Sequence, residues 1–242
     1  MKKFATISHW QAFHSYELAR ASMAGAFIKA SEGLLADPMF LSHWGGFAGT
    51  MRSPFCFWRD AVDPIAQAKF FCDRFDGLLT TSDMPPTIDL EDTSCARKGT
   101  NLWPRVKALV DYVQARTGRI PQIYTAQWWW NPWMLAGLTA KPPDWTANYP
   151  LHVAFYGAAA TLPARMPKGW ASWALWQYIG SPAGGEPIPG MLNPLGDMSK
   201  PHIESGADGL DWLRAALGMN VIPPLTDGEK LARLWDAHPT LH

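Results

Sequence analysis

The amino-acid sequence predicts an α/β fold in which parallel strands form a barrel, and three observations support this prediction. Short apolar runs alternate with helix-like segments from Phe4 to Thr125, and polar or aromatic residues recur where these runs end. After residue 125 the alternation fades, and further strand-like runs follow with few helices between them. Alternating strands and helices are typical of parallel βαβ units. In a barrel of such units the strand ends converge on the rim where chemistry takes place.

The elements of the first half follow from this pattern in chain order. Phe4 to Ser8 predicts the first strand, and Gly25 to Gly33 predicts the second after an intervening helix. The segment from Leu102 to Arg116 is long and amphipathic, as expected of a helix that packs on a sheet. The expected strands are 4–8, 25–33, 53–58, 88–91 and 122–125, and the expected helices are 16–23, 38–50, 64–75 and 102–116.

The second half is less regular. A run of three tryptophans from Trp128 opens a loop or a short helix. Short strands are expected at 144–149, 153–156 and 172–178, a loop rich in Gly and Pro at 181–197, and a helix at 209–217. Pro223 and Pro224 then break the chain, and Thr226 with Glu229 forms a capping-box pattern that predicts a short helix. We therefore expect one domain over residues 1–219 and a linker with a helical tail over 220–242.

The most informative stretch is Ile88-Asp89-Leu90-Glu91, which follows two prolines and alternates apolar with acidic residues. In a strand, residues two apart lie about 6 to 7 Å apart on one face, so Asp89 and Glu91 can reach a common substrate. Shared burial and repulsion would separate their pKa values, leaving one proton donor and one anion. Cleavage of a glycosidic bond needs this division of roles. The alternative is a strand end that carries two solvated acids.

Composition narrows the classes of partner. The chain has 242 residues, of which 48% are hydrophobic, enough for a sizeable core. Its 21 basic residues balance 21 acidic ones, so we expect neither nucleic acid nor a membrane as partner. Aromatic residues make up 13% of the chain, and flat rings are good stacking surfaces for sugars, although most will fill the core.

Other classes of site find little support in the sequence. The three cysteines, Cys56, Cys72 and Cys95, are odd in number and lack metal-site spacing, so we expect buried thiols. Neither a metal constellation nor a phosphate loop is visible, and we expect no cofactor. The amino terminus reaches His9 and Gln11 before any apolar run of signal-peptide length, and no stretch is long enough to span a membrane.

Taken together, the segments resemble glycoside hydrolase family 25, the muramidases that cleave the bond between N-acetylmuramic acid and N-acetylglucosamine in bacterial cell walls. The shared order and spacing of short motifs from the first strand to about residue 217 carry the resemblance. These motifs are Ile7-Ser-His-Trp-Gln11, Ile28-Lys-Ala-Ser-Glu-Gly33, Asp37-Pro-x-Phe40, Phe57-Trp-Arg59 with Gln67-Ala68, Ile88-Asp-Leu-Glu91, Ile123-Tyr-Thr125, Trp145-Thr-Ala-Asn-Tyr149, Trp176-Gln-Tyr178, Pro189-Gly190 and Asp197. The resemblance implies a modified TIM-like (β/α)5(β)3 barrel.

The resemblance also implies roles for three acids. Glu91 would be the general acid that protonates the leaving oxygen, and Asp89 would remain ionised to support positive charge at the anomeric carbon or to orient the acetamido group. Asp197 fits the late aspartate that faces the cleft in the family. Its register stays open, since a long loop precedes it and Asp208 and Asp211 lie nearby.

Nine further residues are candidates for substrate binding. Tyr124 could hydrogen-bond the acetamido group or an acid, or be a tyrosine at the edge of the core. Arg59 is expected to pair with an acid at the rim, and His9 to donate or accept a hydrogen bond there. The candidates are Thr6, His9, Glu32, Arg59, Tyr124, Trp145, Tyr149, Trp176 and Gln177.

One departure from the family pattern concerns Thr6, which stands where the family usually has an aspartate. Threonine cannot carry negative charge, so one anion of the expected acidic cluster is missing, and Glu91 would meet less repulsion. An alternative function follows: a weak or inactive barrel that binds glycan or serves as a structural part of a phage particle. A chitinase-like barrel fits less well, because its D-x-x-D-x-D-x-E pattern requires acids upstream of Asp89.

The resemblance and the missing Sec signal together suggest a biological setting. The expected partner is the glycan strand of bacterial peptidoglycan, and we expect a monomer. A wall-cleaving enzyme made in the cytoplasm without such a signal would reach its substrate after lysis or by specialised release, as a phage endolysin does.

Overall fold

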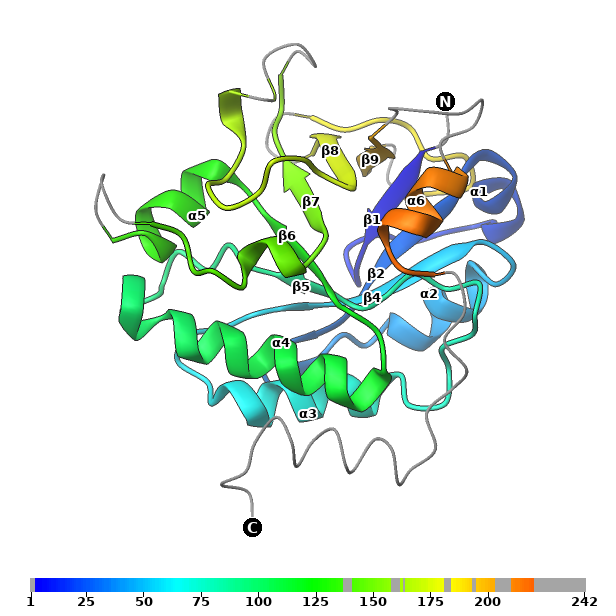
Figure 1. Ribbon diagram of the computed structural model, residues 1–242. Helices are drawn as coiled ribbons and strands as arrows, with labels where there is room; N and C mark the ends of the chain where they lie inside the picture. The colour runs from blue at the N-terminus through cyan, green and yellow to red at the C-terminus, as the bar shows by residue number, and fades with distance from the viewer. Residues whose placement is uncertain are drawn as a thin grey trace.

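The computed structural model describes residues 3–136, 141–157, 162, 164–180, 184–192, 195–202 and 210–219. These residues form a β-barrel with helices around part of its outside (Figure 1). The strands are β1 Phe4–Ile7, β2 Gly25–Glu32, β3 Leu35–Ala36, β4 Met51–Phe57, β5 Thr87–Asp89, β6 Gln122–Thr125, β7 Leu151–Ala154, β8 Leu175–Ile179 and β9 Asp197–Pro201. The α-helices are α1 Tyr16–Ser22, α2 Phe40–Gly46, α3 Pro64–Arg74, α4 Trp103–Thr117, α5 Gln127–Met134 and α6 Leu210–Ala216.

The strand order is β1-β9-β8-β7-β6-β5-β4-β2-β3, and the additional pairing of β1 with β2 closes the sheet. The short β3 pairs with β2, outside the ring, which leaves eight strands in the barrel. Of these, β9 runs antiparallel to both of its neighbours, β1 and β8, whereas the other adjacent pairs are parallel. The first residue of β9 therefore lies beside the carboxyl ends of the other strands.

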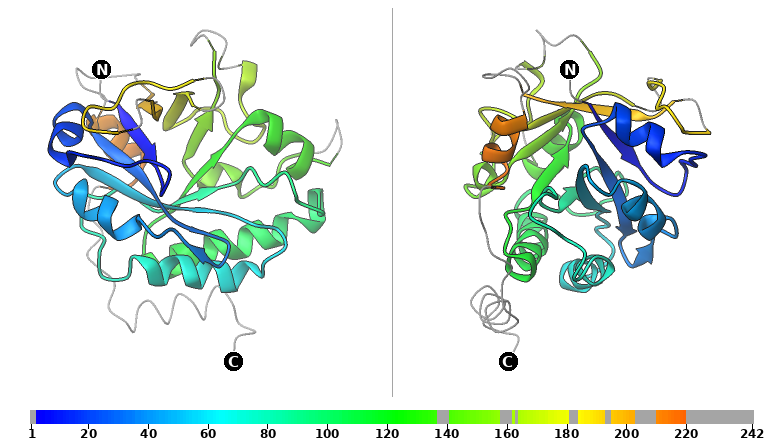
Figure 2. Two further views of the ribbon diagram at one scale, coloured as in Figure 1. Left: turned by 180° about the vertical axis from the view of Figure 1, so that it is seen from behind. Right: turned by 90° about the vertical axis from the view of Figure 1, so that its right-hand side faces the viewer.

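The predicted (β/α)5(β)3 architecture is confirmed. β1, β2, β4, β5 and β6 are each followed by an α-helix, whereas β7, β8 and β9 have no α-helix between them in the described ranges. α3 and α4 lie side by side along the outside of the barrel (Figure 2). Gly118 caps the carboxyl end of α4, and its left-handed φ of 69° favours glycine at this position.

Two predictions for the second half are wrong. The segment 144–149, expected as a strand, contains a 3-10 helix over Thr146–Asn148, because backbone turns form from Pro143 onward. β9 was missed, since the sequence predicts a loop up to Asp197. Its pattern contains the apolar Met198 between polar residues, and pairing with both β1 and β8 makes it a strand. The helix expected over 225–238 and the tail from 220 lie outside the described residues.

The apolar core has two layers. Ile88 and Leu90, expected to anchor β5, are fully buried between the barrel and its helices, where the free thiols also lie. Inside the barrel, Phe4, Phe27 and Phe55 are buried in one cluster with residues of α6. These rings pack the interior of the barrel beneath the carboxyl ends of the parallel strands.

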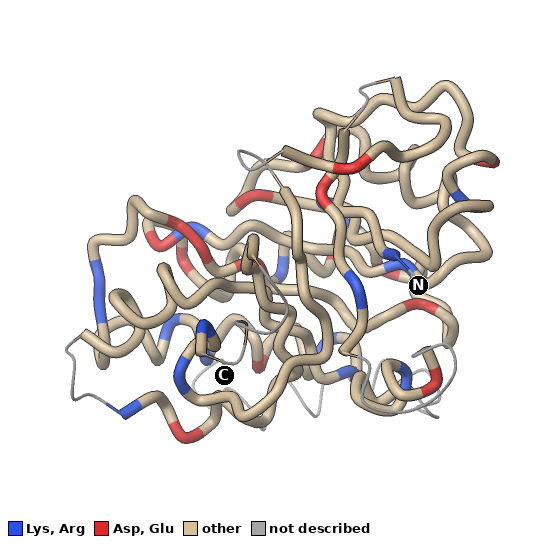
Figure 3. The backbone as a smooth tube through the Cα atoms, turned by 90° about the horizontal axis from the view of Figure 1, so that it is seen from above, with Lys and Arg blue, Asp and Glu red and all other residues tan. Residues whose placement is uncertain are grey.

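The outer surface agrees with the balanced composition. Basic and acidic positions of the described residues are interspersed over the backbone, with neither sign confined to one side (Figure 3). None of the helices among these residues has the length and apolar character needed to cross a bilayer.

A buried ion pair holds the segment that leads into β5. Arg52 on β4 donates from Nε to Asp83 Oδ1 at 2.7 Å and from Nη2 to Asp83 Oδ2 at 2.9 Å. Its guanidinium also lies 4.2 Å from the ring centroid of Trp44. Asp83 is fully buried and accepts two further hydrogen bonds from Thr80. The pair thus fixes the loop immediately before the strand that carries the acidic motif.

Replacing Arg52 with Met would leave the Asp83 carboxylate buried without its counter-ion. Removal of one partner of a buried pair typically costs about 3–5 kcal/mol, and we expect the free energy of unfolding to fall by that amount. Urea denaturation followed by tryptophan fluorescence measures it. The control is Asp76→Asn, which breaks an exposed pair with Arg116 and should cost less than about 1 kcal/mol. Equal losses in the two variants would contradict the anchoring role of the buried pair.

Candidate active site

A pocket of about 350 Å³ lies at the carboxyl ends of the parallel strands. Phe27 and Phe55 belong to its lining and to the apolar cluster beneath it, so they form its floor. The residues that line the pocket are Thr6, Ile7, Ser8, Trp10, Gln11, Phe27, Lys29, Phe55, Phe57, Thr87, Asp89, Glu91, Tyr124, His152, Gln177 and Asp197. A larger pocket of about 620 Å³ lies at the opposite end of the barrel and contains none of the expected catalytic acids.

Three carboxyl groups meet in the pocket at the carboxyl end. Asp89 is the last residue of β5, and Glu91 follows two residues later. Asp197 arrives from the other side of the barrel as the first residue of the antiparallel strand β9. Of the alternatives to Asp197, Asp211 lies on α6 with a largely exposed side chain, and Asp208 is outside the described residues. The geometry therefore favours Asp197 as the third acid.

The environment makes two of these acids hold protons unusually tightly. Burial raises the pKa of Glu91 to about 7, and the charge of Asp197 adds to the rise. Burial also raises the pKa of Asp89 well above its usual range, with repulsion from Glu91 as the second cause. Asp89 is only 7% exposed, and its Oδ1 has no hydrogen-bond partner among the described residues. Neighbouring carboxyls with raised pKa values are typical of sites for acid/base chemistry.

Thr6 lies in the wall of this pocket. It stands directly opposite Asp197 in the antiparallel pairing of β1 and β9. Side chains at such positions point to the same face, with Cβ atoms about 4.5–5.5 Å apart. The buried Thr6 Oγ1 has no hydrogen-bond partner within the described part of the chain. The place where the family pattern expects a carboxylate is thus occupied by a hydroxyl next to the carboxylate of Asp197.

Neutral polar side chains form the wall beyond the acids. Tyr124 on β6 donates its hydroxyl hydrogen to Oε1 of the buried Gln177 on β8. The ring centroid of His152 lies 4.9 Å from that of Tyr124, and its Nε2 is 2.8 Å from Ser199 Oγ. Burial lowers the pKa of His152 to about 3, so this ring is uncharged at neutral pH. Tyr124 and Gln177 therefore lie where the sequence placed them, beside the acids.

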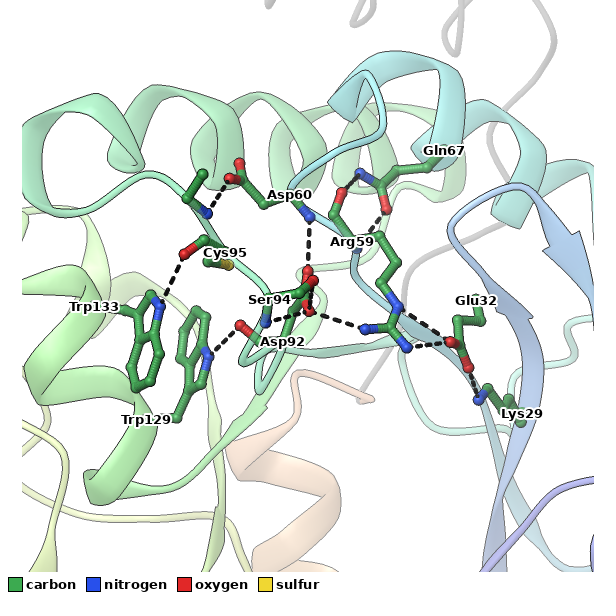
Figure 4. Close-up of polar contacts among 11 residues, drawn as sticks. Lys29, Glu32, Arg59, Asp60, Gln67, Asp92, Ser94, Cys95, Trp129 and Trp133 are labelled. Carbon is green, nitrogen blue, oxygen red and sulfur yellow. Dashed lines mark hydrogen bonds and ion pairs between the residues drawn. The ribbon is translucent and has the colours of Figure 1, made fainter.

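Basic and acidic side chains alternate in a row that begins at Lys29, a residue of the pocket lining (Figure 4). Lys29 Nζ lies 2.5 Å from Glu32 Oε2, and Arg59 donates from Nε to Glu32 Oε1 at 3.1 Å. Arg59 also donates from Nη1 to Asp92 Oδ1 at 2.9 Å. Glu32 and Arg59 were both predicted as site residues. Neither lines the pocket, but both belong to the row of ion pairs that begins at Lys29, which does.

His9 and Trp176 are adjacent to the site but do not line the pocket. His9 Nδ1 is 2.9 Å from Asp37 Oδ2, and its backbone N–H donates to the same oxygen at 3.0 Å. Trp176 alternates with Gln177 on β8, so its ring faces the outside of the barrel. There its Nε1 donates to the backbone oxygen of Phe155 at 2.7 Å.

Trp145 and Tyr149 are the two candidates that the fold carries away from the acids. Both precede β7 and therefore lie toward the amino-terminal end of the barrel. The hydroxyl of Tyr149 donates to Asp111 Oδ1 on α4 at 3.0 Å, and the rings of Trp145 and Trp130 are in edge contact. Tyr149 also lines the larger pocket at that end. The structure does not bring these two side chains to the site of Glu91.

Several residues of the lining, among them Lys29, Trp10 and His152, were not among the candidates from the sequence. Lys29 lies in a quoted motif and shares the strand face of Phe27, so period-two alternation could have identified it. Trp10 also lies in a quoted motif, and its 71% exposure suits an aromatic surface at the rim. His152 had no local signal, because it enters the site through the pairing of β7 with β6, in which it lies opposite Tyr124. Among the described residues, no group of three His, Cys, Asp or Glu side chains could hold a metal ion.

Comparison with known proteins identifies a family and relatives of this chain. The sequence model of "Glycosyl hydrolases family 25" matches residues 6–184. The chain is 29% identical over 187 residues to "Lysozyme M1" of Streptomyces globisporus, an alignment that covers 71% of this chain and 60% of that protein. It is 30% identical over 161 residues to an "N,O-diacetylmuramidase" of Arthroderma benhamiae, covering 62% of this chain and 64% of the other. The chain thus spans less than two thirds of the length of either relative.

Solved structures share the fold. A bacterial lysozyme from Streptomyces coelicolor superposes with a TM-score of 0.75 at 24% identity, covering 90% of this chain and 98% of that one. A muramidase from Trichobolus zukalii superposes with a TM-score of 0.71 at 25% identity, covering 90% and 99%. Since the family model matches well over half of the residues, the chain belongs to family 25 of the glycosyl hydrolases.

Proposed function

We propose that this chain is a peptidoglycan hydrolase that cleaves the β-1,4 bond between N-acetylmuramic acid and N-acetylglucosamine. The observation that carries the proposal is the carboxyl of Glu91, whose pKa is raised to about 7 in a pocket shared with Asp89 and Asp197. A carboxyl that keeps its proton near neutral pH can act as a general acid. Membership of family 25 and relatives named lysozyme and muramidase agree with this substrate class.

The proposed mechanism divides the chemistry among the three acids. Glu91 donates its proton to the glycosidic oxygen as the bond to the anomeric carbon breaks. Asp89, ionised and beside it, supports the positive charge that develops at that carbon or orients the acetamido group. Asp197 raises the proton affinity of Glu91 and contributes further negative potential. The burial of Asp89 and Glu91 strengthens these interactions, because charges interact more strongly where the effective dielectric is low.

The pocket also offers surfaces for the sugar rings. Trp10 projects at the rim with 71% of its surface exposed, and an indole face can stack on a pyranose ring. Tyr124 and Gln177 offer hydrogen-bonding groups deeper in the wall. We expect the glycan strand to enter over Trp10 and to bind as a neutral ligand to a monomeric enzyme. Access to the wall after lysis or by specialised release, as for an endolysin, is part of the same proposal.

The alternative, a weak or inactive barrel, rests on Thr6. Against it stands the pKa of Glu91, which burial and the charge of Asp197 raise to about 7 although the first strand lacks its acid. An active enzyme is therefore the better supported reading of the same site.

Replacing Glu91 with Gln should abolish proton donation while keeping the size of the side chain. General acid catalysis contributes typically about 10²–10⁴-fold, and we expect turnover of purified peptidoglycan to fall by at least about 100-fold. Release of reducing ends measures the rate, and mass spectrometry should find fragments that end in reducing N-acetylmuramic acid. Glu17→Gln, an exposed acid on α1, is the matched control and should be as active as wild type. Equal rates for Glu91→Gln and wild type would refute the assignment of the acid.

The pH dependence of the reaction should have its alkaline limb near pH 7. Below that pH Glu91 holds the proton that it must donate, and above it kcat/KM should fall about tenfold per pH unit. The same raised pKa destabilises the folded state as pH rises from 4.5 toward 7, because the unfolded chain ionises first. Glu91→Gln should therefore raise the Tm at about pH 8 and leave it unchanged at about pH 4. A flat rate profile between pH 6 and 9 would contradict this role.

Thr6→Asp should restore a carboxylate opposite Asp197. The added negative charge favours the protonated form of Glu91, so the alkaline limb should move to higher pH, by roughly one unit. Thr6→Asn, which adds no charge, is the control and should leave the limb in place. If wild type releases no reducing ends and Thr6→Asp does, the inactive-barrel alternative is correct.

A further inference from the structure

The acidic pair poses a question that the proposed mechanism leaves open. Asp89 and Glu91 interact closely, and the mechanism requires the proton on Glu91 and the negative charge on Asp89. Burial alone favours the opposite arrangement. Asp89 is more buried than Glu91, and its Oδ1 has no hydrogen-bond partner among the described residues, so its charged form lacks solvation. Some other group must therefore favour the anion at Asp89.

Lys29 is placed to do this. Its side chain is 14% exposed, lines the pocket, and holds its Nζ 5.4 Å from the ring centroid of Phe57. Phe57 on β4 is the direct register partner of Asp89 on β5, so the ammonium lies over the residue next to Asp89. The charge of Lys29 lowers the pKa of Asp89, whereas the charged neighbour that acts on Glu91 is Asp197, which raises the pKa of Glu91. Lys29 thus favours the anion at Asp89, and Asp197 favours the proton on Glu91.

A chain of ion pairs fixes the position of Lys29 (Figure 4). Its Nζ donates to Glu32. Arg59 donates both to Glu32 and to Asp92. Asp92 is fully buried and accepts hydrogen bonds from the backbone N–H groups of Asp60 and Ser94, each at 3.0 Å. The guanidinium of Arg59 also lies 4.5 Å from the ring centroid of Phe57. A flexible lysine is thereby held in one place by partners that are themselves anchored in the core.

We propose that Lys29 is a positioning residue: its ammonium, held by the Glu32–Arg59–Asp92 chain, keeps the negative charge of the acidic pair on Asp89 and the proton on Glu91. This inference rests on the proposed function, because it explains how the two carboxyls receive different roles. It concerns the charge state of the free protein, however, and can be tested without turnover.

The other charged or titratable groups around Asp89 do not supply the same bias. Glu91 on the same segment and Glu32 on β2 both disfavour the anion at Asp89, and Arg59, after β4, favours it less than Lys29 does. Cys56 on β4, Tyr124 on β6 and His152 on β7 are buried, and their shifted pKa values keep all three uncharged at neutral pH. Asp197 on β9 carries negative charge. Lys29 is thus the strongest favourable charge that acts on the Asp89 anion.

The experiment replaces Lys29 with Met, which keeps a long side chain and removes the charge. Carboxyl groups are observed by ¹³C NMR in protein labelled at Asp and Glu, with Asp89→Asn and Glu91→Gln used to assign the two resonances. In wild type we expect Asp89 to titrate below Glu91. In Lys29→Met we expect the pKa of Asp89 to rise by about one unit or more, and kcat to fall at least about tenfold with KM within about twofold, since one pKa unit redistributes the proton tenfold.

A second variant gives an effect of opposite sign. Glu32→Gln removes the anion that neutralises Lys29 and that repels Asp89, so the pKa of Asp89 should fall below its wild-type value. A purely structural role of this cluster would not raise the pKa of Asp89 in Lys29→Met and lower it in Glu32→Gln. Lys69→Met, which removes an exposed lysine on α3 paired with Asp73, is the matched control and should change neither titration nor rate.

Two outcomes would overturn the inference: Asp89 keeps its proton to higher pH than Glu91 in wild type, or Lys29→Met leaves the Asp89 titration within about 0.3 units of wild type. If the titrations shift as expected in a protein that cleaves no peptidoglycan, the proposed function is wrong and the placement of charge by Lys29 stands. If wild type cleaves peptidoglycan but the titrations do not shift, the proposed function stands and the proposed role of Lys29 is wrong.

Discussion

Repulsion between two neighbouring carboxyl groups, of which Asp89 is almost fully buried, is the constraint on which the rest of this structure depends. Asp89 and Glu91 cannot both be ionised there at low cost, because burial and proximity each disfavour a second charge. In a solvated loop the same two residues would be ordinary acids. Here they lie above the aromatic floor of Phe27 and Phe55, inside the wall of strands, and burial raises the pKa of both.

Maintaining such a pair requires a rigid frame. The segment that leads into β5 is fixed by Arg52 and Asp83, and the chain after β4 by the ion pairs that run from Lys29 to Asp92. Both sets contain a fully buried aspartate that accepts several hydrogen bonds. The buried pair of Arg52 and Asp83 therefore serves mainly to position β5, since the energy of such a pair is largely offset by the desolvation of its charges.

The direction of β9 explains why a carboxylate lies beside Thr6. If β9 ran parallel to its neighbours, its first residue would lie at the amino-terminal end of the barrel, far from Glu91. Because β9 is antiparallel, Asp197 instead faces the pocket and stands opposite Thr6. A carboxylate from the last strand thus lies beside the position where the first strand lacks one. The negative potential at Glu91 then depends on Asp197 more than the family pattern would suggest.

The sequence by itself determined the local features of this protein. The alternation around Ile88-Asp89-Leu90-Glu91 placed both acids on one face, and the strand–helix order to Thr125 predicted the five βα units, because these patterns depend on residues close in the chain. Only the tertiary structure decided which distant residues complete the site. It brought Asp197 and His152 in through strand pairing, carried Trp145 and Tyr149 to the other end, and turned Trp176 outward while Gln177 faced the pocket. The meeting of Asp197 with Thr6 depends on barrel closure and on the antiparallel direction of β9, which are set by contacts between segments more than a hundred residues apart and leave no local trace in the sequence.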